Sequence, residues 1–562
     1  MNKRVIRDYL ESLKEDNELD FIFPLLLESM GFQIISTPKN SKGQPQFGKD
    51  VIAIGKDNKG KKHKWYFELK GNAAKDITSK NFNINDGVRD SILAAKDAKY
   101  SDLGVPELEK LPQKIVFVHN GILKSNVANQ LNGLIEREFE KGEFERWDLD
   151  KLVDLFSKYL FDECLYRDED LYRLIKRVLA TFDAPGWTTK DIEIIFDRIL
   201  SECPASQNKK RLVNQCFNSI SLLVAILYKE CKIVNNLLPA KKTSDIAVLK
   251  CWGWMIANNK INEKTCIDLF TKLLILQLRI YESYLSKLIP LAVSYKGLYV
   301  INRMDSEQIF YPLRCFDFIQ DVIYYFEATK RLYPLEKRDD LCKNSVQLIL
   351  SIIKNNPGFN MPLLDTHGIP ILAIFKYIWN NSRDWEKDNV DLFSWLNSMI
   401  NNIILRKNTH DMFPELYGNH KELAKSINKK SINYRDESSL LLLTIIELLY
   451  LYDCADLYEN LKKTIDESGV DLQVSYPIDS ENLENNLFSK GLYNDLSVET
   501  GIQLPEKLCD LKNFLKKPYN PIPLKTEQTG YAFLLYLAHF HYKTDWFPDF
   551  FNTGFIIPLS SK

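Results

Sequence analysis

The residue pattern changes character near position 160, and this change restricts the fold of the chain more than any other feature of the sequence. Before it, short strand-like runs alternate with helix-like segments, whereas after it apolar residues recur almost entirely at helical spacing. We therefore expect an α/β domain with a mixed central sheet flanked by helices, followed by a large all-α region. The expected divisions are 1–165 for the α/β domain, and 166–356 and 357–562 for two helical domains.

Composition excludes several classes of protein. Of the 562 residues, 45% are hydrophobic and 27% are charged, so the chain can bury large cores and is neither disordered nor fibrous. Lysine and arginine number 74 against 75 aspartate and glutamate residues, which leaves a formal net charge of -1. A uniformly basic nucleic-acid coat is therefore excluded, and any nucleic-acid site must be local.

Cysteine usage and apolar runs indicate the compartment. The ten cysteines include no CxxC pair, which favours free thiols in a reducing environment. The first residues lack the apolar stretch of a secretory signal, and the most apolar run, Leu440 to Tyr452, is about 13 residues long and contains Glu447. We expect a cytoplasmic protein that does not associate with a membrane.

The first 160 residues predict the order helix, three strands, helix, strand, helix, strand. The first helix is Phe21 to Phe32, and the three strands are Gln33 to Thr37, Val51 to Ile54 and Trp65 to Leu69, of which the last two form a hairpin across a glycine- and lysine-rich turn. The later elements are a helix marked by Ile84, Val88 and Ile92, a buried strand Ile115 to Val118, a helix with Leu131 to Phe139, a strand Phe144 to Trp147, and a helix Leu149 to Leu160.

Three charged side chains carry the strongest chemical signal. Successive residues of a strand point to opposite faces, so Glu68 and Lys70 emerge on one face while Phe67 and Leu69 pack on the other. Asp50 opens the preceding strand, and hairpin pairing brings its carboxylate close to that of Glu68. Two carboxylates that repel each other fit a shared divalent cation, and Mg²⁺ prefers oxygen ligands with several retained waters. Lys70 then lies where it can orient or deprotonate a metal-bound water.

These residues also match a known motif. A G-K-D string at 48–50 and an E-L-K string at 68–70, separated by 17 residues, resemble the PD-(D/E)xK motif of the restriction-endonuclease-like nuclease superfamily. The resemblance implies that Asp50 and Glu68 hold Mg²⁺, for which Mn²⁺ can substitute, and that Lys70 serves the attacking water. Many members place a glutamate on the first core helix near the metal, and Glu28 is the matching residue.

The resemblance extends to the order of elements and covers about 160 of the 562 residues. Gly48 and Lys49 stand where the motif has proline, as in the GxD variant of the Mrr-like branch. The strand that ends in Val118-His119-Asn120-Gly121, with the elements after it, resembles Mrr-like nuclease domains at the amino terminus of bacterial anti-phage effectors. The alternative from the residues alone is that Glu68 and Lys70 form an ordinary exposed pair on a structural sheet.

Lysines are concentrated around this motif. Residues 38 to 75 hold ten lysines against three acidic residues, and a basic hairpin beside a metal site suits binding of a phosphate backbone without base reading. The predicted DNA contacts are Lys49, Lys59, Lys61, Lys62 and Lys64. The alternative is a solvated lysine-rich turn that blunts the edge of a sheet.

The expected function is that of a metal-dependent DNA endonuclease, which the resemblance extends to an effector of bacterial anti-phage defence. The helical region is expected to regulate it through oligomerisation, partner docking or sensing. Expected partners are DNA, further copies of the chain, and a separately encoded protein. The sequence has no GxxxxGK[ST] phosphate loop, so ATP hydrolysis in such a system would come from a partner ATPase. The alternatives are a non-catalytic helical scaffold that binds nucleic acid or a partner, and a repair or junction nuclease of the same fold.

Other polar residues receive a structural interpretation. His119 ends an apolar strand, where a histidine is more often structural than catalytic. His539 lies in an aromatic stretch and is expected in the core or at an interface rather than at a metal. The string Asp365-Thr366-His367-Gly368 is expected to form a loop.

Overall fold

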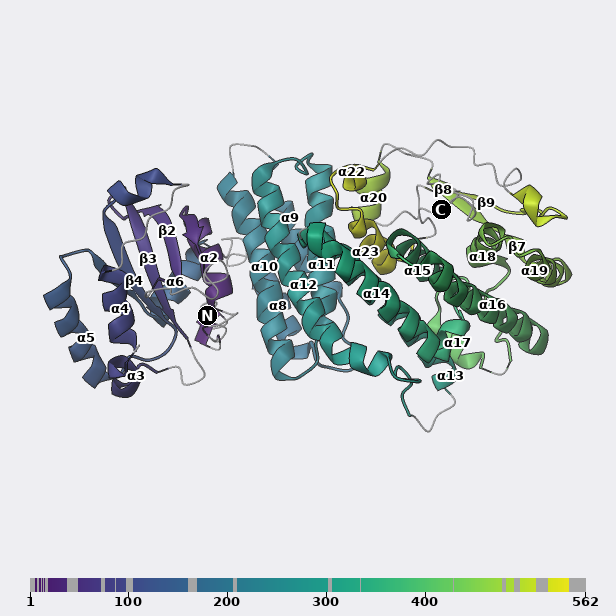
Figure 1. The fold of residues 1–562 in the computed structure, drawn as a ribbon, viewed down its shortest axis with the longest axis horizontal. Helices are drawn as coiled ribbons and strands as arrows, with labels where there is room; N and C mark the ends of the chain where they lie inside the picture. The colour runs from purple at the N-terminus through teal and green to yellow at the C-terminus, as the bar shows by residue number, and fades with distance from the viewer. Residues whose placement is uncertain are drawn as a thin grey trace. The chain divides into compact units, whose positions relative to one another are not determined.

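The computed structural model in Figure 1 describes most of the chain. The residues described are 6–7, 10–11, 13, 15, 19–37, 49–71, 76–85, 87–97, 105–159, 169–205, 210–301, 306–333, 335–427, 429–477, 482–489, 496–511 and 524–544. They divide into two compact units, 1–243 and 244–562, at a point within helix α11 (Leu238–Ala257). The predicted border at 165/166 lies outside the described residues, and the one at 356/357 falls between α14 and η4 without interrupting a helix.

The first unit combines a sheet with helices. Its elements, in chain order, are α2 (Asp20–Ser29), β1 (Gln33–Ser36), β2 (Val51–Lys56), β3 (Lys62–Lys70), α3 (Ser79–Asn83), α4 (Val88–Asp97), η2 (Pro106–Lys110), β4 (Gln113–His119), α5 (Ser125–Glu138), β5 (Phe144–Trp147), α6 (Leu149–Tyr159), α8 (Glu169–Thr181), α9 (Lys190–Ser201) and α10 (Lys210–Ile233).

The five strands form one mixed sheet in the order β1-β2-β3-β4-β5. The pairs β1–β2 and β2–β3 are antiparallel, whereas the pairs β3–β4 and β4–β5 are parallel. The connection from β3 to β4 contains α3 and α4, and the connection from β4 to β5 contains α5. The predicted α/β region with a mixed sheet is therefore confirmed.

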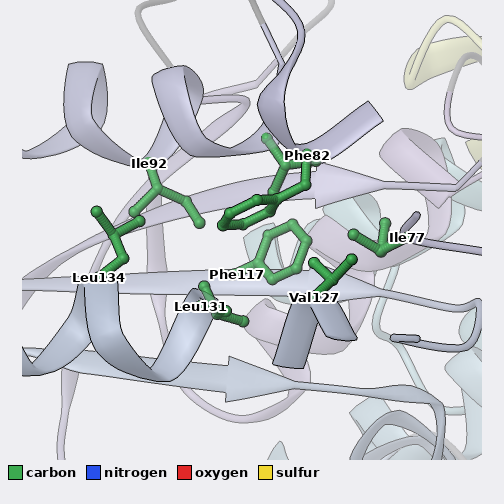
Figure 2. Packing of buried hydrophobic residues seen from close by; sticks show 8 residues of the cluster. Ile77, Phe82, Ile92, Phe117, Val127, Leu131 and Leu134 are labelled. Atoms are coloured by element: carbon green, nitrogen blue, oxygen red, sulfur yellow. The ribbon is translucent and has the colours of Figure 1, made fainter. Parts of the chain in front are cut away.

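Helices cover both faces of the sheet because its central strands are apolar on both sides. Figure 2 shows the core on one face, where Phe117 of β4 packs among side chains of the helices that precede and follow β4. This cluster consists of Ile77, Phe82, Val88, Ile92, Phe117, Val127, Leu131 and Leu134. On the other face, Phe23 of α2 contacts Phe67 of β3 and Trp147 of β5, with ring centroids 5.3 and 6.1 Å apart.

The predicted start of one helix in this unit is wrong. Ile84 was grouped with Val88 and Ile92, but α3 ends at Asn83, Ile84 is extended and exposed, and α4 begins at Val88. Gly87 forms a tight turn between them and donates its N–H to the Ile84 carbonyl at 2.8 Å. A Cβ on Gly87 would lie 2.6 Å from that carbonyl oxygen, so only glycine permits this turn. The i+4 spacing of the apolar residues continues across the turn, although the helix does not.

The second unit is mostly helical. Its elements are α12 (Lys264–Ala292), α13 (Glu307–Leu332), α14 (Leu335–Asn355), η4 (Pro357–Asn360), η5 (Asp365–His367), α15 (Gly368–Asn381), α16 (Trp385–His410), α17 (His420–Lys425), β6 (Ser438–Ser439), α18 (Leu440–Leu451), α19 (Ala455–Ser468), β7 (Asp471–Leu472), β8 (Val474–Pro477), α20 (Leu483–Ser489), β9 (Leu496–Glu499), η6 (Leu508–Asp510), α22 (Lys525–Gln528) and α23 (Phe533–Tyr542). The expected all-α region therefore needs one correction, because β6-β7 and β8-β9 form two-stranded sheets.

Within the part of the chain that the structure describes, one apolar helix meets the length and composition of a membrane span. The stretch Leu212–Ile233 of α10 has 22 residues, and most of it is buried inside the protein. Core helices of water-soluble proteins show the same properties, so this stretch is weak evidence for a span.

Candidate catalytic site

Asp50, Glu68 and Lys70 meet at one end of the β2–β3 hairpin. The register pairs Val51 with Phe67, so Asp50, just before β2, lies opposite Glu68. The Leu69 N–H donates to Asp50 Oδ2 at 2.7 Å, and Lys70 Nζ lies 2.9 Å from Glu68 Oε1. The alternation of β3 puts Glu68 and Lys70 on one face, as the sequence predicted.

A third carboxylate, from Glu15, joins this cluster and was not predicted. Glu15 Oε1 lies 3.0 Å from Lys70 Nζ, and its Oε2 accepts from the Gly71 N–H at 3.4 Å. The Glu15 backbone N–H also donates to the Gly71 carbonyl. Glu15 and Lys70 are 55 residues apart in the chain, and no periodicity or motif in the sequence connects them.

Asn120 brings the amino-terminal segment to this end of the sheet. Its side chain is fully buried, and Nδ2 donates to the carbonyls of Leu10 and Leu13 at 2.7 and 2.8 Å. The Asn120 backbone N–H donates to the Lys70 carbonyl at 3.4 Å. One asparagine at the end of β4 thus links the carboxyl end of β3 to the segment that carries Glu15.

Charge in the cluster is unbalanced. Burial first, and the Glu68 carboxylate second, raise the pKa of the Asp50 carboxyl to about 8. Burial also raises the pKa of Glu15. Burial alone would lower the pKa of the Lys70 ammonium, but Glu68, Glu15 and Asp50 together raise it above its ordinary value. In the metal-free protein Lys70 therefore remains charged and can orient a water or stabilise negative charge, whereas accepting a proton is disfavoured.

Glu28 lies toward a different part of the sheet. Phe32, four residues after it, packs on Trp65 with ring centroids 5.2 Å apart, and its ring fills the space beside Gly55. These contacts place the carboxyl end of α2 toward the hairpin turn, away from Asp50. The metal role that the resemblance implied for Glu28 therefore has no support in the geometry.

The lysine-rich turn lies at the far end of the hairpin. Lys56 pairs with Lys62 beside the turn, six residues along β3 from Glu68, which corresponds to about 20 Å. Asp57 accepts from the backbone N–H groups of Lys59 and Lys61, both at 2.9 Å, and thereby shapes the turn. The predicted basic hairpin exists, but its turn is not beside the carboxylates.

The five predicted DNA-binding lysines differ in accessibility. Lys59, Lys61 and Lys62 are exposed, and Lys64 is half-buried. Lys49 is only 5% exposed, and its ammonium lies over the Tyr66 ring, 4.8 Å from the centroid. Burial lowers its pKa to about 8, and Lys64 adds to this effect. Three of the five lysines are thus on the surface, while Lys49 packs within the domain.

His119 lies on the same face as Lys70, its partner across β3 and β4. It is buried, its ring stacks on Phe117 with centroids 5.2 Å apart, and its Nδ1 contacts the Gly121 carbonyl at 2.9 Å. That carbonyl is an acceptor, so Nδ1 carries the proton. Burial lowers the pKa of the ring, which is therefore neutral at pH 7. These contacts fit the structural interpretation given from the sequence.

The carboxylate pair is compatible with a divalent cation that keeps much of its water. Within the described ranges, no group of three or more His, Cys, Asp or Glu side chains is arranged to hold a metal. Mg²⁺, however, is commonly bound through one or two carboxylates together with waters and substrate phosphates. Asp50 and Glu68 supply two such carboxylates, and the raised pKa of Asp50 marks a position where added positive charge is stabilising.

Comparison of the chain with protein-family models, with curated proteins and with solved structures found no match.

Proposed function

We propose that this chain is a divalent-metal-dependent phosphodiesterase that cuts DNA, with Asp50, Glu68 and Lys70 in its active site. The observation that carries the proposal is the meeting of these three side chains at the end of one hairpin, with Lys70 Nζ 2.9 Å from Glu68. The helix, three-strand, helix, strand order of the domain supports the resemblance to restriction-endonuclease-like nucleases.

Each residue has a distinct role in this proposal. Asp50 and Glu68 would hold the metal, and the Leu69 N–H fixes the orientation of the Asp50 carboxylate. When bound, the metal supplies a Lewis acid for the phosphate and lowers the pKa of a coordinated water. Lys70 retains its positive charge and stabilises the negative charge that develops on the phosphate.

The exposed lysines suggest how DNA is held. A separation of about 20 Å between the turn and the carboxylates corresponds to about six base-pair steps of 3.4 Å. Lys59, Lys61 and Lys62 can therefore contact the DNA backbone away from the cleaved phosphate. Such contacts strengthen binding without reading sequence, so DNA affinity should fall steeply with salt.

The size of the helical region supports a regulatory role for it. A phosphodiesterase site needs only the sheet domain, whereas most of the chain lies outside it. We assign to the helical region the control of cutting, through self-association or a separately encoded partner such as an ATPase. The effector role in anti-phage defence rests on the resemblance alone.

The test is cleavage of supercoiled and linear plasmid DNA with Mg²⁺ or Mn²⁺. Wild-type protein should cut, and Asp50→Ala and Lys70→Ala should each lower the rate by about 100-fold or more. Asp90→Asn, which neutralises an exposed carboxylate on α4, serves as the matched control and should cut like wild type. A parallel reaction with branched DNA distinguishes a junction nuclease, which should prefer that substrate.

Two results would contradict the proposal. Equal cutting by all four proteins would mean that the activity lies elsewhere or belongs to a contaminant. Absence of cutting, together with Mg²⁺ binding by calorimetry that is the same in wild type and Asp50→Ala, would favour the non-catalytic scaffold.

A further inference from the structure

Lys70 and Gly71 form a corner that binds an anion, and Glu15 occupies it. The ammonium holds one oxygen of the Glu15 carboxylate at 3.0 Å, and the Gly71 N–H contacts the other at 3.4 Å. A cation and a backbone N–H that share one carboxylate make charge-assisted contacts that suit any two-oxygen anion. The two non-bridging oxygens of a DNA phosphate present the same pattern.

Neighbouring residues fix the geometry of this corner. A Cβ on Gly71 would lie 2.9 Å from Asn120 Oδ1, so a side chain at position 71 would disturb the buried asparagine. Asn120 Oδ1 itself is buried and has no hydrogen-bond partner among the described residues. The same asparagine holds the Leu10 and Leu13 carbonyls and thereby positions the segment that carries Glu15.

Glu15 differs from Glu68 in accessibility and from Asp50 in its contacts. The Glu15 side chain is 31% exposed, whereas that of Glu68 is only 3% exposed. Both Glu15 oxygens face Lys70 and Gly71, whereas Asp50 uses only Oδ2 in its contact with the Leu69 N–H. Glu15 is therefore the member of the cluster that a solvent-borne anion can replace.

We infer that the Lys70–Gly71 corner is the subsite for a DNA backbone phosphate, and that Glu15 fills it at rest as an internal competitor. The inference rests on the proposed function only for the identity of the anion. An entering phosphate takes over the Lys70 ammonium and the Gly71 N–H, and the Glu15 carboxylate moves into solvent. DNA binding therefore displaces Glu15 from Lys70, and every substrate must compete with Glu15 for this corner.

The experiment neutralises Glu15 without shortening it. In the full-length protein with Mg²⁺, inorganic phosphate is titrated against wild type, Glu15→Gln, and the control Glu11→Gln, which removes one charge from the same segment. Glu15→Gln should bind phosphate about tenfold more tightly than wild type, and phosphate should raise its melting temperature by about 2–4 °C more. Glu11→Gln should behave like wild type. Adding Lys70→Gln to Glu15→Gln should abolish the gain.

A second readout uses a fluorescent DNA duplex in Ca²⁺ and its cleavage in Mg²⁺. Glu15→Gln should bind the duplex about tenfold more tightly and cut at lower DNA concentration. Unchanged or weaker phosphate binding by Glu15→Gln would overturn the inference, even if wild type cuts DNA. Weaker Mg²⁺ binding with lost cutting would overturn it in favour of Glu15 as a metal ligand. Tighter phosphate binding in a protein that never cuts DNA would support the corner while the nuclease proposal fails.

Discussion

Two groups of buried carboxylates, one in each unit, have different partners. In the helical unit, Asp365 accepts from Ser439 Oγ at 2.5 Å and from the backbone N–H groups of Leu440 and Leu441 at 3.0 and 3.1 Å, where α18 begins. All these donors are neutral, and the positive end of the helix dipole favours the negative charge. In the sheet unit, by contrast, three carboxylates gather around one lysine.

This difference separates a structural role from a functional one. A carboxylate matched by neutral donors stabilises the fold and needs nothing more. At the cluster around Lys70, burial first and the neighbouring carboxylates second raise the pKa values of Asp50 and Glu15, so the ionised carboxylates are less favourable there than in water. Folding alone gains nothing from such an arrangement, whereas the metal and the phosphate of the proposed function would make it favourable. Neutralising substitutions should therefore have opposite effects at Asp365 and at this cluster.

The largest effect is expected at Asp365. Asp365→Ala removes three hydrogen bonds and leaves the buried donors at the start of α18 without an acceptor. The free energy of unfolding should fall by about 4 kcal/mol. Urea unfolding followed by circular dichroism measures this loss. Glu467→Ala, at an exposed position on α19, is the control, and an equal effect of both variants would contradict the comparison.

Acid should also weaken the helical unit. His539 is fully buried, and burial lowers its pKa to about 3, so the folded state holds it neutral while the unfolded state takes up a proton below about pH 6.5. The unfolded state therefore binds more protons in this window, and stability is lost as pH falls. Between pH 7 and pH 5 this histidine should account for about 2 kcal/mol, and His367 adds a change in the same direction.

Urea unfolding at pH 7 and pH 5 tests the role of this histidine. His539→Gln should show a smaller difference between the two pH values than wild type, because glutamine does not titrate. The same pH difference in both proteins would assign the acid sensitivity to other groups.

A smaller effect of opposite sign is expected at Asp50. Its folded pKa of about 8 exceeds its ordinary value of 3.8, so the folded state binds the extra proton and metal-free stability falls as pH rises between these values. Asp50→Asn keeps an acceptor for the Leu69 N–H and removes the repulsion, which should stabilise the metal-free protein by about 1–2 kcal/mol at pH 8.

Thermal unfolding with and without Mg²⁺ completes this test. Mg²⁺ should raise the melting temperature of wild type and leave that of Asp50→Asn unchanged. Destabilisation by Asp50→Asn, as for Asp365→Ala, would remove the contrast between the units.

The smallest effect is expected in a buried hydrogen-bond network of the helical unit. Tyr324 Oη donates to Gln277 Oε1 at 2.6 Å, and Gln277 Nε2 and Tyr281 Oη donate to Asp245 Oδ1 at 2.8 and 2.9 Å. Tyr324→Phe removes one bond of this network and should cost about 1 kcal/mol in urea unfolding. DNA cutting, if observed for wild type, should not change; an altered rate would show that this network reaches the active site.

Local patterns predicted the sheet domain well where the chain follows a simple period. β5 has the predicted bounds, and β2 and β3 contain the predicted strands with two to four further residues. The alternation in β3 was enough to put Glu68 and Lys70 on one face. The pattern failed at Ile84, where helical spacing continues through a turn made by Gly87. It also missed the role of Asp365, because capping of α18 depends on residues 74 to 76 positions away.

The sequence alone determined the strand pattern and, with it, the meeting of Asp50, Glu68 and Lys70, because a hairpin brings together residues that are close in the chain. The tertiary structure decided the rest of the site. Glu15 contacts Lys70 from a segment that Asn120, 107 to 110 positions away from Leu13 and Leu10, holds at the end of the sheet. Glu28 belongs to α2, which packs through Phe23 on Phe67 and thus on the face of the sheet opposite to Glu68 and Lys70. Side-chain periodicity predicts which residues of one helix or strand share a face. Contacts between distant segments form only when the whole domain folds.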